Sequence, residues 1–291
     1  MLRRLEKLGH WFFYVAMKFF GHTGGRILLF PVVSCYVVFS RKIHAIVRYY
    51  LSRRFPEAGW LRYWYYTLKT VLSFGNVLVD RGWLGLYGDA DFTGELYGRT
   101  TINEFISQGK GVVLLTAHVG NWQSALSHLG DLPVKVNALM QYDREAAAQH
   151  YFDLGRRERS FEIIDADSSF GGMIEAAAAL QRGEVVTIMG DRYIKGPYSE
   201  VEFFGEKVRL PNSAYALAAT VGAPVVVLLA AKTGARSHQL KVWDSFHPEY
   251  RSREERDDML RSCTRRYIKA VEDYLMVHPF QWYNFYNFWG Q

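Results

Sequence analysis

Short, continuous runs of apolar residues recur along the chain from about Asp91 onward. Four of them have the length of a strand: Val112–Thr116, Val134–Met140, Val185–Met189 and Val225–Leu229. Runs in which apolar residues are continuous and do not alternate with polar ones are typical of parallel strands that are buried on both faces of a sheet, and these runs are apolar at most positions. Segments of helical character separate them: Trp122–Leu129, Arg144–Arg157, Gly172–Gln181 and Ser213–Val221. This pattern predicts an α/β fold with a mostly parallel central sheet flanked by helices.

Two segments near the C-terminus extend the pattern. Gln239–Trp243 predicts an antiparallel strand at an edge of the sheet, and Arg253–His278 predicts a last long helix that Pro279 ends. No internal repeat or low-complexity linker interrupts the sequence. Residues 60–291 are therefore predicted to form one α/β domain.

The first 59 residues have a different pattern, in which apolar runs are interspersed with basic residues. Trp11–Met17 ends at Lys18, and Ile27–Phe39 contains Pro31. Neither run reaches the roughly 20 apolar residues that a spanning helix needs. No small-residue cleavage site follows the first run, which disfavours a secretory signal peptide.

The segment Arg41–Arg54 has the pattern of a basic amphipathic helix. Its apolar positions recur at helical spacing, and its polar side carries Arg41, Lys42, Arg48, Arg53 and Arg54. Such a helix typically lies in the headgroup plane of a membrane, and the alternative is an ordinary surface helix with a solvated charged face. We expect residues 1–59 to form a helical membrane-association segment. An aromatic-rich helix over Trp60–Val79 follows, and we expect it to end at Asp80, Arg81 and Gly82.

Positive charge is concentrated in this N-terminal part. Up to Arg81 there are 13 Lys and Arg residues against three Asp and Glu residues, whereas the net charge of all 291 residues is only +6. A basic region points to a polyanionic partner. Because the basic residues are interspersed in apolar runs and not grouped in polar loops, we expect an anionic membrane surface and no nucleic acid. The two cysteines are too few for a disulfide framework or a four-cysteine zinc site.

The first candidate for chemistry is a histidine that follows a predicted strand. After Val112–Thr116 the chain continues through His118 to Gly120, Asn121 and Trp122, which predicts a turn and a helix that begins near Trp122. Ligands of open α/β sheets bind at this end of the strands. A histidine there can take a proton from a hydroxyl or an amine, and N–H groups near the turn can bind a developing oxyanion. The alternative is a core histidine that only caps the turn.

A second strand end carries a charged pair. Val185–Met189 is followed by Gly190, Asp191 and Arg192. A carboxylate is suited to fixing a histidine tautomer, and a guanidinium is suited to binding a phosphate or phosphopantetheine group. The alternative is an Asp–Arg ion pair that closes the loop.

Several short motifs occur in a fixed order along the chain. They are His118-Val-Gly-Asn-Trp, Gly190-Asp-Arg, Phe203-Phe-Gly and Leu210-Pro, between the aromatic N-terminal segment and the ending Gln281–Trp289. This order resembles the lysophospholipid acyltransferase superfamily, in the branch that contains the bacterial lipid A late acyltransferases, and the resemblance covers nearly the whole chain. It implies an α/β acyltransferase on the cytoplasmic face of the bacterial inner membrane. Such an enzyme moves a fatty acyl chain from acyl carrier protein or acyl-CoA to an amphiphilic acceptor.

One position departs from that family's signature, which is a histidine, four residues, and then Asp or Glu. The chain has Gln123 at this place. The acid stabilises the imidazolium that forms when the histidine takes a proton, whereas an amide can only orient the ring. In the serine-protease triad, the change from carboxylate to amide lowers the rate by about ten-thousandfold. Either another carboxylate replaces the acid, with Asp191 the first candidate and Asp143 the second, or the protein is impaired.

The residues and the resemblance together favour a membrane-associated acyltransferase. We expect direct transfer without an acyl-enzyme, with His118 as general base, Asp191 or Gln123 as its partner, and Arg192 on the donor's phosphate or on an acidic acceptor group. Gly120, Asn121 and Trp122 complete the candidate substrate-binding residues. No metal or cofactor is expected, since a thioester is already activated. The alternative is an impaired relative that binds lipid or assists assembly, and a hydrolase ranks third because the chain has no Gly-x-Ser-x-Gly.

Overall fold

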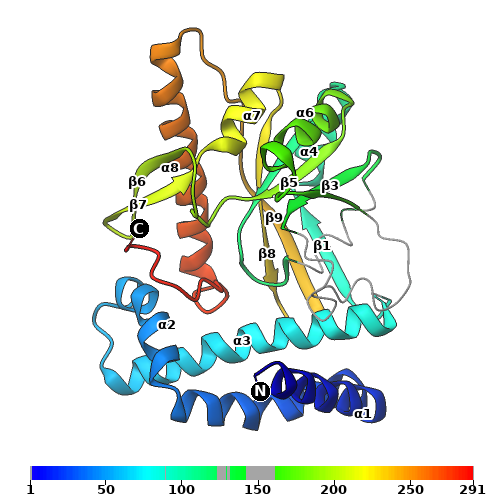
Figure 1. Cartoon of the computed structure of the whole chain (residues 1–291), viewed down its shortest axis with the longest axis vertical. Coiled ribbons are helices and arrows are strands. Elements are labelled where there is room, and N and C mark those ends of the chain that lie inside the picture. The colour runs from blue at the N-terminus through cyan, green and yellow to red at the C-terminus, as the bar shows by residue number, and fades with distance from the viewer. Residues whose placement is uncertain (1, 89, 123–128, 130–131, 142–160, 291) are drawn as a thin grey trace.

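The computed structural model describes residues 2–88, 90–122, 129, 132–141 and 161–290. Within these residues the centre of the molecule is a seven-stranded sheet with the strand order β1-β9-β8-β2-β5-β3-β4 (Figure 1). Every neighbouring pair is parallel except β8 and β9. The strands are β1 (Thr93–Tyr97), β2 (Val112–Thr116), β3 (Val136–Met140), β4 (Glu162–Asp165), β5 (Val185–Met189), β8 (Val225–Lys232) and β9 (Ser237–Phe246).

The four strands predicted from continuous apolar runs are confirmed. β2 and β5 have the predicted bounds, while β3 begins at Val136 and β8 continues to Lys232. The segment Gln239–Trp243 lies in β9, which is antiparallel to β8 as predicted. Its placement at an edge is wrong, because β1 pairs with its other side. Alternate residues of β1 are exposed, so this strand has no apolar run that marks it in the sequence.

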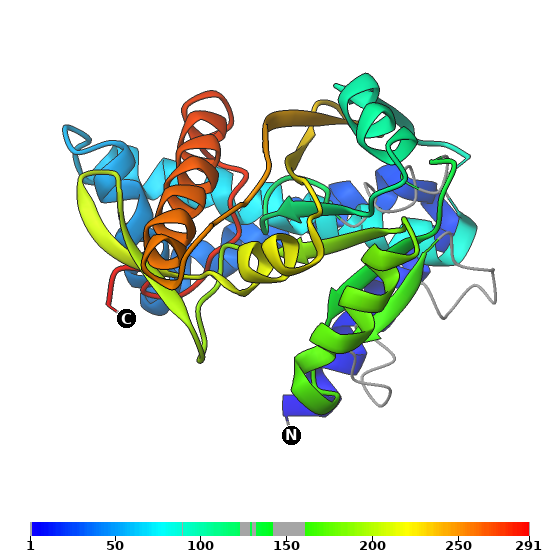
Figure 2. The same cartoon turned by 90° about the horizontal axis from the view of Figure 1, so that it is seen from above.

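The apolar runs are continuous because the sheet is covered on both faces. Val113 and Leu115 of β2 belong to a core shared with the helices α6, α7 and α8, whereas Val112 and Leu114 belong to a second core with Ile102 of α4. Figure 2 shows α4 on one side of the strands and α6 and α7 on the other. These helices span Arg99–Ser107 (α4), Met173–Gln181 (α6), Ser213–Val221 (α7) and Arg253–Val277 (α8), and a 3-10 turn, η2, precedes α6 at Ser169–Gly172.

A small antiparallel hairpin lies beside α8. It consists of β6 (Tyr198–Phe203) and β7 (Glu206–Pro211), and its two-residue loop is Phe204–Gly205. Both loop residues have positive φ angles, 49° and 78°, as a tight turn that matches the strand twist requires. The Phe-Phe-Gly motif is therefore the turn of this hairpin.

Three helices form a layer at the carboxyl ends of β2, β5 and β8 (Figure 1). They are α1 (Leu2–Phe39), α2 (Arg41–Arg54) and α3 (Trp60–Tyr87), and α3 packs against both of the others. The prediction that α3 ends at Asp80 is wrong, since the helix continues to Tyr87. Asp80 is fully buried, and partners on other elements, described below, compensate its charge. The division of the chain at residue 59 stays a prediction.

The helix α1 is bent at Gly21, whose φ of 66° is left-handed. Trp11–Phe39 is long and apolar enough to cross a membrane by length and composition, in contrast to the two separate short runs that the sequence predicted. One face of this segment is buried, with Met17, Leu29, Val33 and Val37 on it. Its other face exposes Phe19, Phe20, Ile27, Phe30 and Phe39.

The basic residues of α2 divide into two groups. Arg41, Lys42 and Arg48 are exposed. Arg53, however, pairs with Glu206 at 2.6 Å, and Arg54 donates to the carbonyl groups at the end of α8. The prediction of one five-residue basic face is therefore wrong, because two of the five bind the α/β domain.

Candidate functional site

Two parallel strands bring His118 and Asp191 to the same level of the sheet. Thr116 at the end of β2 pairs with Met189 at the end of β5, and His118 and Asp191 each follow by two residues. Both residues therefore lie at the carboxyl edge of the sheet, where α/β proteins bind ligands. The layer formed by α1, α2 and α3 lies at this edge (Figure 1).

The carboxylate of Asp191 is the direct partner of the His118 ring. Its Oδ1 lies 2.8 Å from His118 Nδ1, and its Oδ2 accepts the backbone N–H of His118 at 2.9 Å. The indole N–H of Trp282 also donates to Oδ2, at 3.0 Å. Asp191 is fully buried, so these N–H groups replace the water that an exposed carboxylate would bind. Asp143 and Gln123, the other predicted partners, lie outside the described residues.

The surroundings keep Asp191 ionised. Burial by itself raises the pKa of a carboxyl group, but the charge of protonated His118 and the N–H donors outweigh burial and hold the pKa of Asp191 below its usual value. An ionised Asp191 accepts the Nδ1–H of the ring, which leaves the lone pair of neutral His118 on Nε2. This tautomer is the one that a general base requires.

The turn after His118 is held from two sides. Gly120 has a φ of 50°, and a Cβ added there would lie 2.1 Å from the carbonyl oxygen of Ala230, so this position accepts only glycine. The Gly120 N–H donates to the carbonyl of Gln281 at 2.8 Å, and the Tyr283 N–H donates to the carbonyl of His118 at 2.9 Å. Of the N–H groups near the turn that the sequence offered as oxyanion donors, that of Gly120 is thus engaged by the C-terminal segment.

A cavity of about 1190 Å³ opens beside His118. Charged and aromatic groups line one part of it: Arg81, His118, Trp122, Arg192, Lys195 and Tyr283. Apolar side chains from one face of the sheet line another part: Leu114, Ala138, Ile163, Leu228, Ala230 and Leu240. His118 retains 16% of its side-chain exposure and lines the cavity, so its ring is accessible from there.

The other predicted site residues divide between the cavity and its support. The Trp122 ring lies 5.6 Å from the His118 ring, measured between centroids, and lines the cavity. Arg192 also lines the cavity and donates to the carbonyl of Tyr283 at 3.2 Å. Because Asp191 is engaged by His118 and Trp282, the alternative of an Asp191–Arg192 pair closing the loop is wrong. The Asn121 side chain is buried and donates to Asp80 at 2.9 Å, so it supports the turn.

Asp80 is a residue that the sequence pattern did not single out for the site. Its carboxylate accepts hydrogen bonds from the side chains of Asn121 and Lys232. One carboxylate oxygen also lies 2.7 Å from Nε2 of His22, the residue that directly follows the bend of α1 at Gly21. Burial lowers the pKa of Lys232, and the charge of Asp80 acts in the opposite direction. This buried cluster connects α1, α3 and β8 with the turn that carries His118. These partners are far apart in the sequence, so no local pattern could have indicated them.

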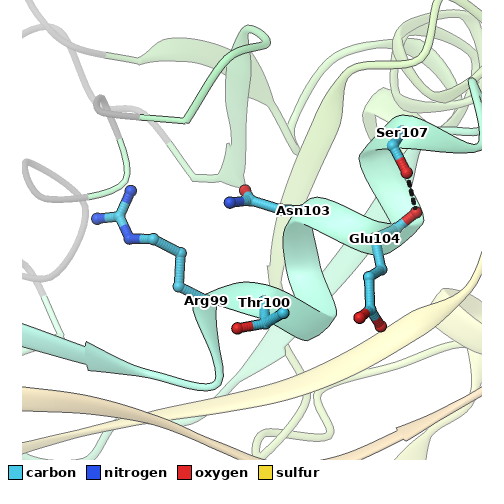
Figure 3. A pocket seen from close by; sticks show the side chains of 5 residues that line it. All are labelled: Arg99, Thr100, Asn103, Glu104 and Ser107. Carbon is cyan, nitrogen blue, oxygen red and sulfur yellow. Dashed lines mark hydrogen bonds between the residues drawn. The ribbon is translucent and has the colours of Figure 1, made fainter.

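A second, smaller hollow of about 380 Å³ lies on α4, away from this site. Figure 3 shows its side chains, Arg99, Thr100, Asn103, Glu104 and Ser107, all on that helix. The hydroxyl of Ser107 donates to the carbonyl of Glu104 at 2.8 Å. Its described lining contains no histidine or buried carboxylate, so the chemistry is assigned to the larger cavity.

The fold and the His–Asp pair define an α/β protein with a histidine–carboxylate pair at a partly apolar cavity. Residues 87–291 match the sequence model of the bacterial lipid A biosynthesis acyltransferases, and the chain belongs to this family. It is an acyltransferase that acts on lipid substrates. No curated protein matches the sequence. Among solved structures, that of the 1-acyl-sn-glycerophosphate (LPA) acyltransferase PlsC from Thermotoga maritima is similar, with 14% identity and a TM-score of 0.37 over 84% of this chain and 97% of that one.

Proposed function

We propose that this chain transfers a fatty acyl group from the thioester of acyl carrier protein or acyl-CoA to a hydroxyl or amine of an amphiphilic lipid, with His118 as general base. The observation that carries the proposal is the 2.8 Å contact between His118 Nδ1 and the buried Asp191 carboxylate. It orients the ring and supplies the negative charge that Gln123 lacks.

The reaction needs one base and no covalent intermediate on the protein. His118 Nε2 takes the proton of the acceptor group while the acceptor oxygen or nitrogen attacks the thioester carbonyl. The C–S bond then breaks, and His118 returns the proton to the leaving thiolate. The products are an ester or amide and a free thiol. Between these two proton transfers Asp191 stabilises the imidazolium of His118, and Asp191 itself stays ionised.

The cavity provides surfaces for both parts of the substrates. Its apolar wall suits the acyl chain, because each buried methylene contributes about 0.8 kcal/mol. Arg192 and Lys195 on its polar part suit a phosphate of the donor or an acidic group of the acceptor. Trp122 lies between the His118 and Tyr283 rings and suits contact with substrate near the reacting atoms.

We further propose that the chain is a peripheral or monotopic protein on the cytoplasmic face of the bacterial inner membrane. Support comes from the exposed apolar face of α1, which lies opposite the face packed on the protein. The exposed Arg41, Lys42 and Arg48 of α2 add attraction to anionic lipid, worth about 1 kcal/mol each near the surface. Because His22 of α1 is buried against Asp80, we infer that α1 lies along the membrane and does not leave the domain to cross it.

A second candidate function is that of an impaired relative that binds lipid or assists assembly, and Gln123 is the observation that favours it. The two are separated by the total lipids of cells with and without the chain, compared by mass spectrometry. A lipid that gains one acyl group only when the wild-type chain is expressed, and not with His118→Ala, supports the enzyme. Identical lipids in all three samples support the non-catalytic function.

A further inference from the structure

The C-terminal segment after α8 crosses the site and is fixed on both sides. The Gln281 side chain accepts the backbone N–H of Lys232 at 2.8 Å and donates to its carbonyl at 2.9 Å. Trp282 forms an antiparallel bridge with Val119, next to His118. The backbone at Trp282 is therefore held between the end of β8 and the turn that carries the base.

The Trp282 side chain is oriented by aromatic neighbours. It is 2% exposed, and its ring lies 5.1 Å from the Tyr50 and Phe288 rings and 5.5 Å from the Phe203 ring, measured between centroids. These contacts give the indole N–H one direction, toward Oδ2 of Asp191 at 3.0 Å. Trp282 is not among the described residues that line the cavity, so it reaches the reaction only through Asp191.

We propose that Trp282 is a positioning residue for acyl transfer, which sets the orientation and the basicity of Asp191. The inference rests on the proposed function of His118. With the indole N–H and the backbone N–H both on Oδ2, Oδ1 is the oxygen left to face the His118 ring. The arrangement is a chain of three side chains, Trp282, Asp191 and His118, that joins the C-terminal segment to the base.

Loss of the indole N–H has two consequences for the His–Asp pair. The carboxylate loses one of the donors that hold its orientation, so fewer molecules have the ring placed for proton removal. A carboxylate with fewer donors also holds a proton on the pair more strongly. The lower limb of the pH–rate profile, where the base becomes protonated, therefore moves to higher pH.

The test is Trp282→Phe, which keeps an aromatic ring and removes the N–H, in the full-length enzyme. We expect kcat to fall about tenfold, as for loss of a hydrogen bond to a charged group. The lower limb of the pH–rate profile should move to higher pH by about half to one pH unit. KM should stay within about twofold of the wild-type value. Added to Asp191→Asn, the change should have no further effect on kcat, since the indole acts through that carboxylate.

Trp289→Phe is the matched control. Trp289 belongs to the same aromatic cluster, in contact with Trp282 and Phe203, but its N–H donates to the carbonyl of Phe203 at 3.2 Å. This variant should keep the wild-type kcat and pH profile. Wild-type kinetics in Trp282→Phe, or the same pH shift in Trp289→Phe, would overturn the assignment.

A spectroscopic measurement decides the contact even if Trp282→Phe does not fold or no transfer is found. With 15N-labelled tryptophan, the full-length protein in detergent gives indole signals for its eight tryptophans. We expect the chemical shift of one indole signal to change in Asp191→Asn. The same signal should keep its chemical shift in Asp167→Asn, which changes a carboxylate on the cavity wall. If no indole signal responds to Asp191→Asn, the inference is wrong. Absence of transfer by the wild type would count instead against the proposed function.

Discussion

The substitution Asp191→Asn tests how the charge of this carboxylate acts on His118. Asparagine has nearly the same shape, but only its oxygen can accept the two N–H groups that now converge on Oδ2, from the His118 backbone and the Trp282 indole. Its NH2 group then faces Nδ1 of His118. Because an NH2 group only donates, Nδ1 must become the acceptor, and the ring proton moves to Nε2.

The expected loss of activity follows from that tautomer. A ring with its proton on Nε2 has no lone pair toward the cavity, and the imidazolium would lack its negative partner. The same change in the serine-protease triad lowers kcat about 10⁴-fold, which corresponds to about 5.4 kcal/mol in activation free energy at roughly 1.36 kcal/mol per factor of ten. We expect Asp191→Asn to lower kcat by at least about a hundredfold here, with a smaller effect on KM.

The assay follows the acylated lipid and the released thiol by mass spectrometry, with purified enzyme in detergent and a thioester donor. Asp258→Asn is the charge-matched control, since Asp258 is exposed on α8, pairs with Arg261 at 3.8 Å and is not among the described residues that line the cavity. It should keep kcat within about fivefold. If Asp191→Asn retained a kcat within tenfold of the wild type, or if both variants lost activity equally, the reasoning about His118 would be refuted.

Three further predictions concern stability and membrane binding. Asp80→Ala leaves Lys232 and His22 buried without their carboxylate and should lower the free energy of unfolding by about 3 to 5 kcal/mol. The control is Asp91→Ala, which removes an exposed ion pair with Arg236 and should leave the melting temperature nearly unchanged. The pKa of Asp191 is lower in the folded protein than in the unfolded chain, so its charge stabilises the fold fully above about pH 4. The melting temperature of the wild type should therefore decrease as the pH falls below this value, and Asp191→Asn should show a smaller decrease. Replacement of Arg41, Lys42 and Arg48 by Gln should weaken binding to anionic vesicles by about a hundredfold at low salt and reduce the salt dependence of that binding. Replacement of Arg53 and Arg54 by Gln should weaken vesicle binding less, because these two residues bind the α/β domain. A larger loss of binding in the second variant would contradict this assignment.

The sheet was predictable where burial leaves a local pattern. β2, β5 and β8 are enclosed on both faces, so most of their positions are apolar and the runs stand out. β1 and β4 are edge strands with exposed or half-exposed residues, and such short segments have no distinctive pattern. The edge position assigned to Gln239–Trp243 was wrong for the same reason, because its outer neighbour β1 could not be recognised.

The candidate site was predictable to the level of strand ends. His118 and Asp191 each follow an apolar run, and adjacent parallel strands bring such residues together. The contacts of Asp80 and Trp282 depend on how α1, α3 and the C-terminal segment pack on the sheet. Asp80, together with Arg81 and Gly82, was interpreted as the end of a helix that in fact continues to Tyr87. Its partners, 58 residues before and 152 residues after it, are brought to it only by the tertiary fold.

The central claim is that His118 removes a proton during acyl transfer to a lipid. The measurement that tests it most directly compares the purified full-length chain with His118→Ala, using acyl-CoA and acyl carrier protein donors in parallel and a lipid extract as acceptor. The wild type should form an acylated lipid and an equal amount of thiol, and His118→Ala should lose about a hundredfold or more of that activity with its melting temperature retained. A His118→Ala variant with most of the wild-type transfer, or a wild type that releases only free fatty acid, would contradict the account.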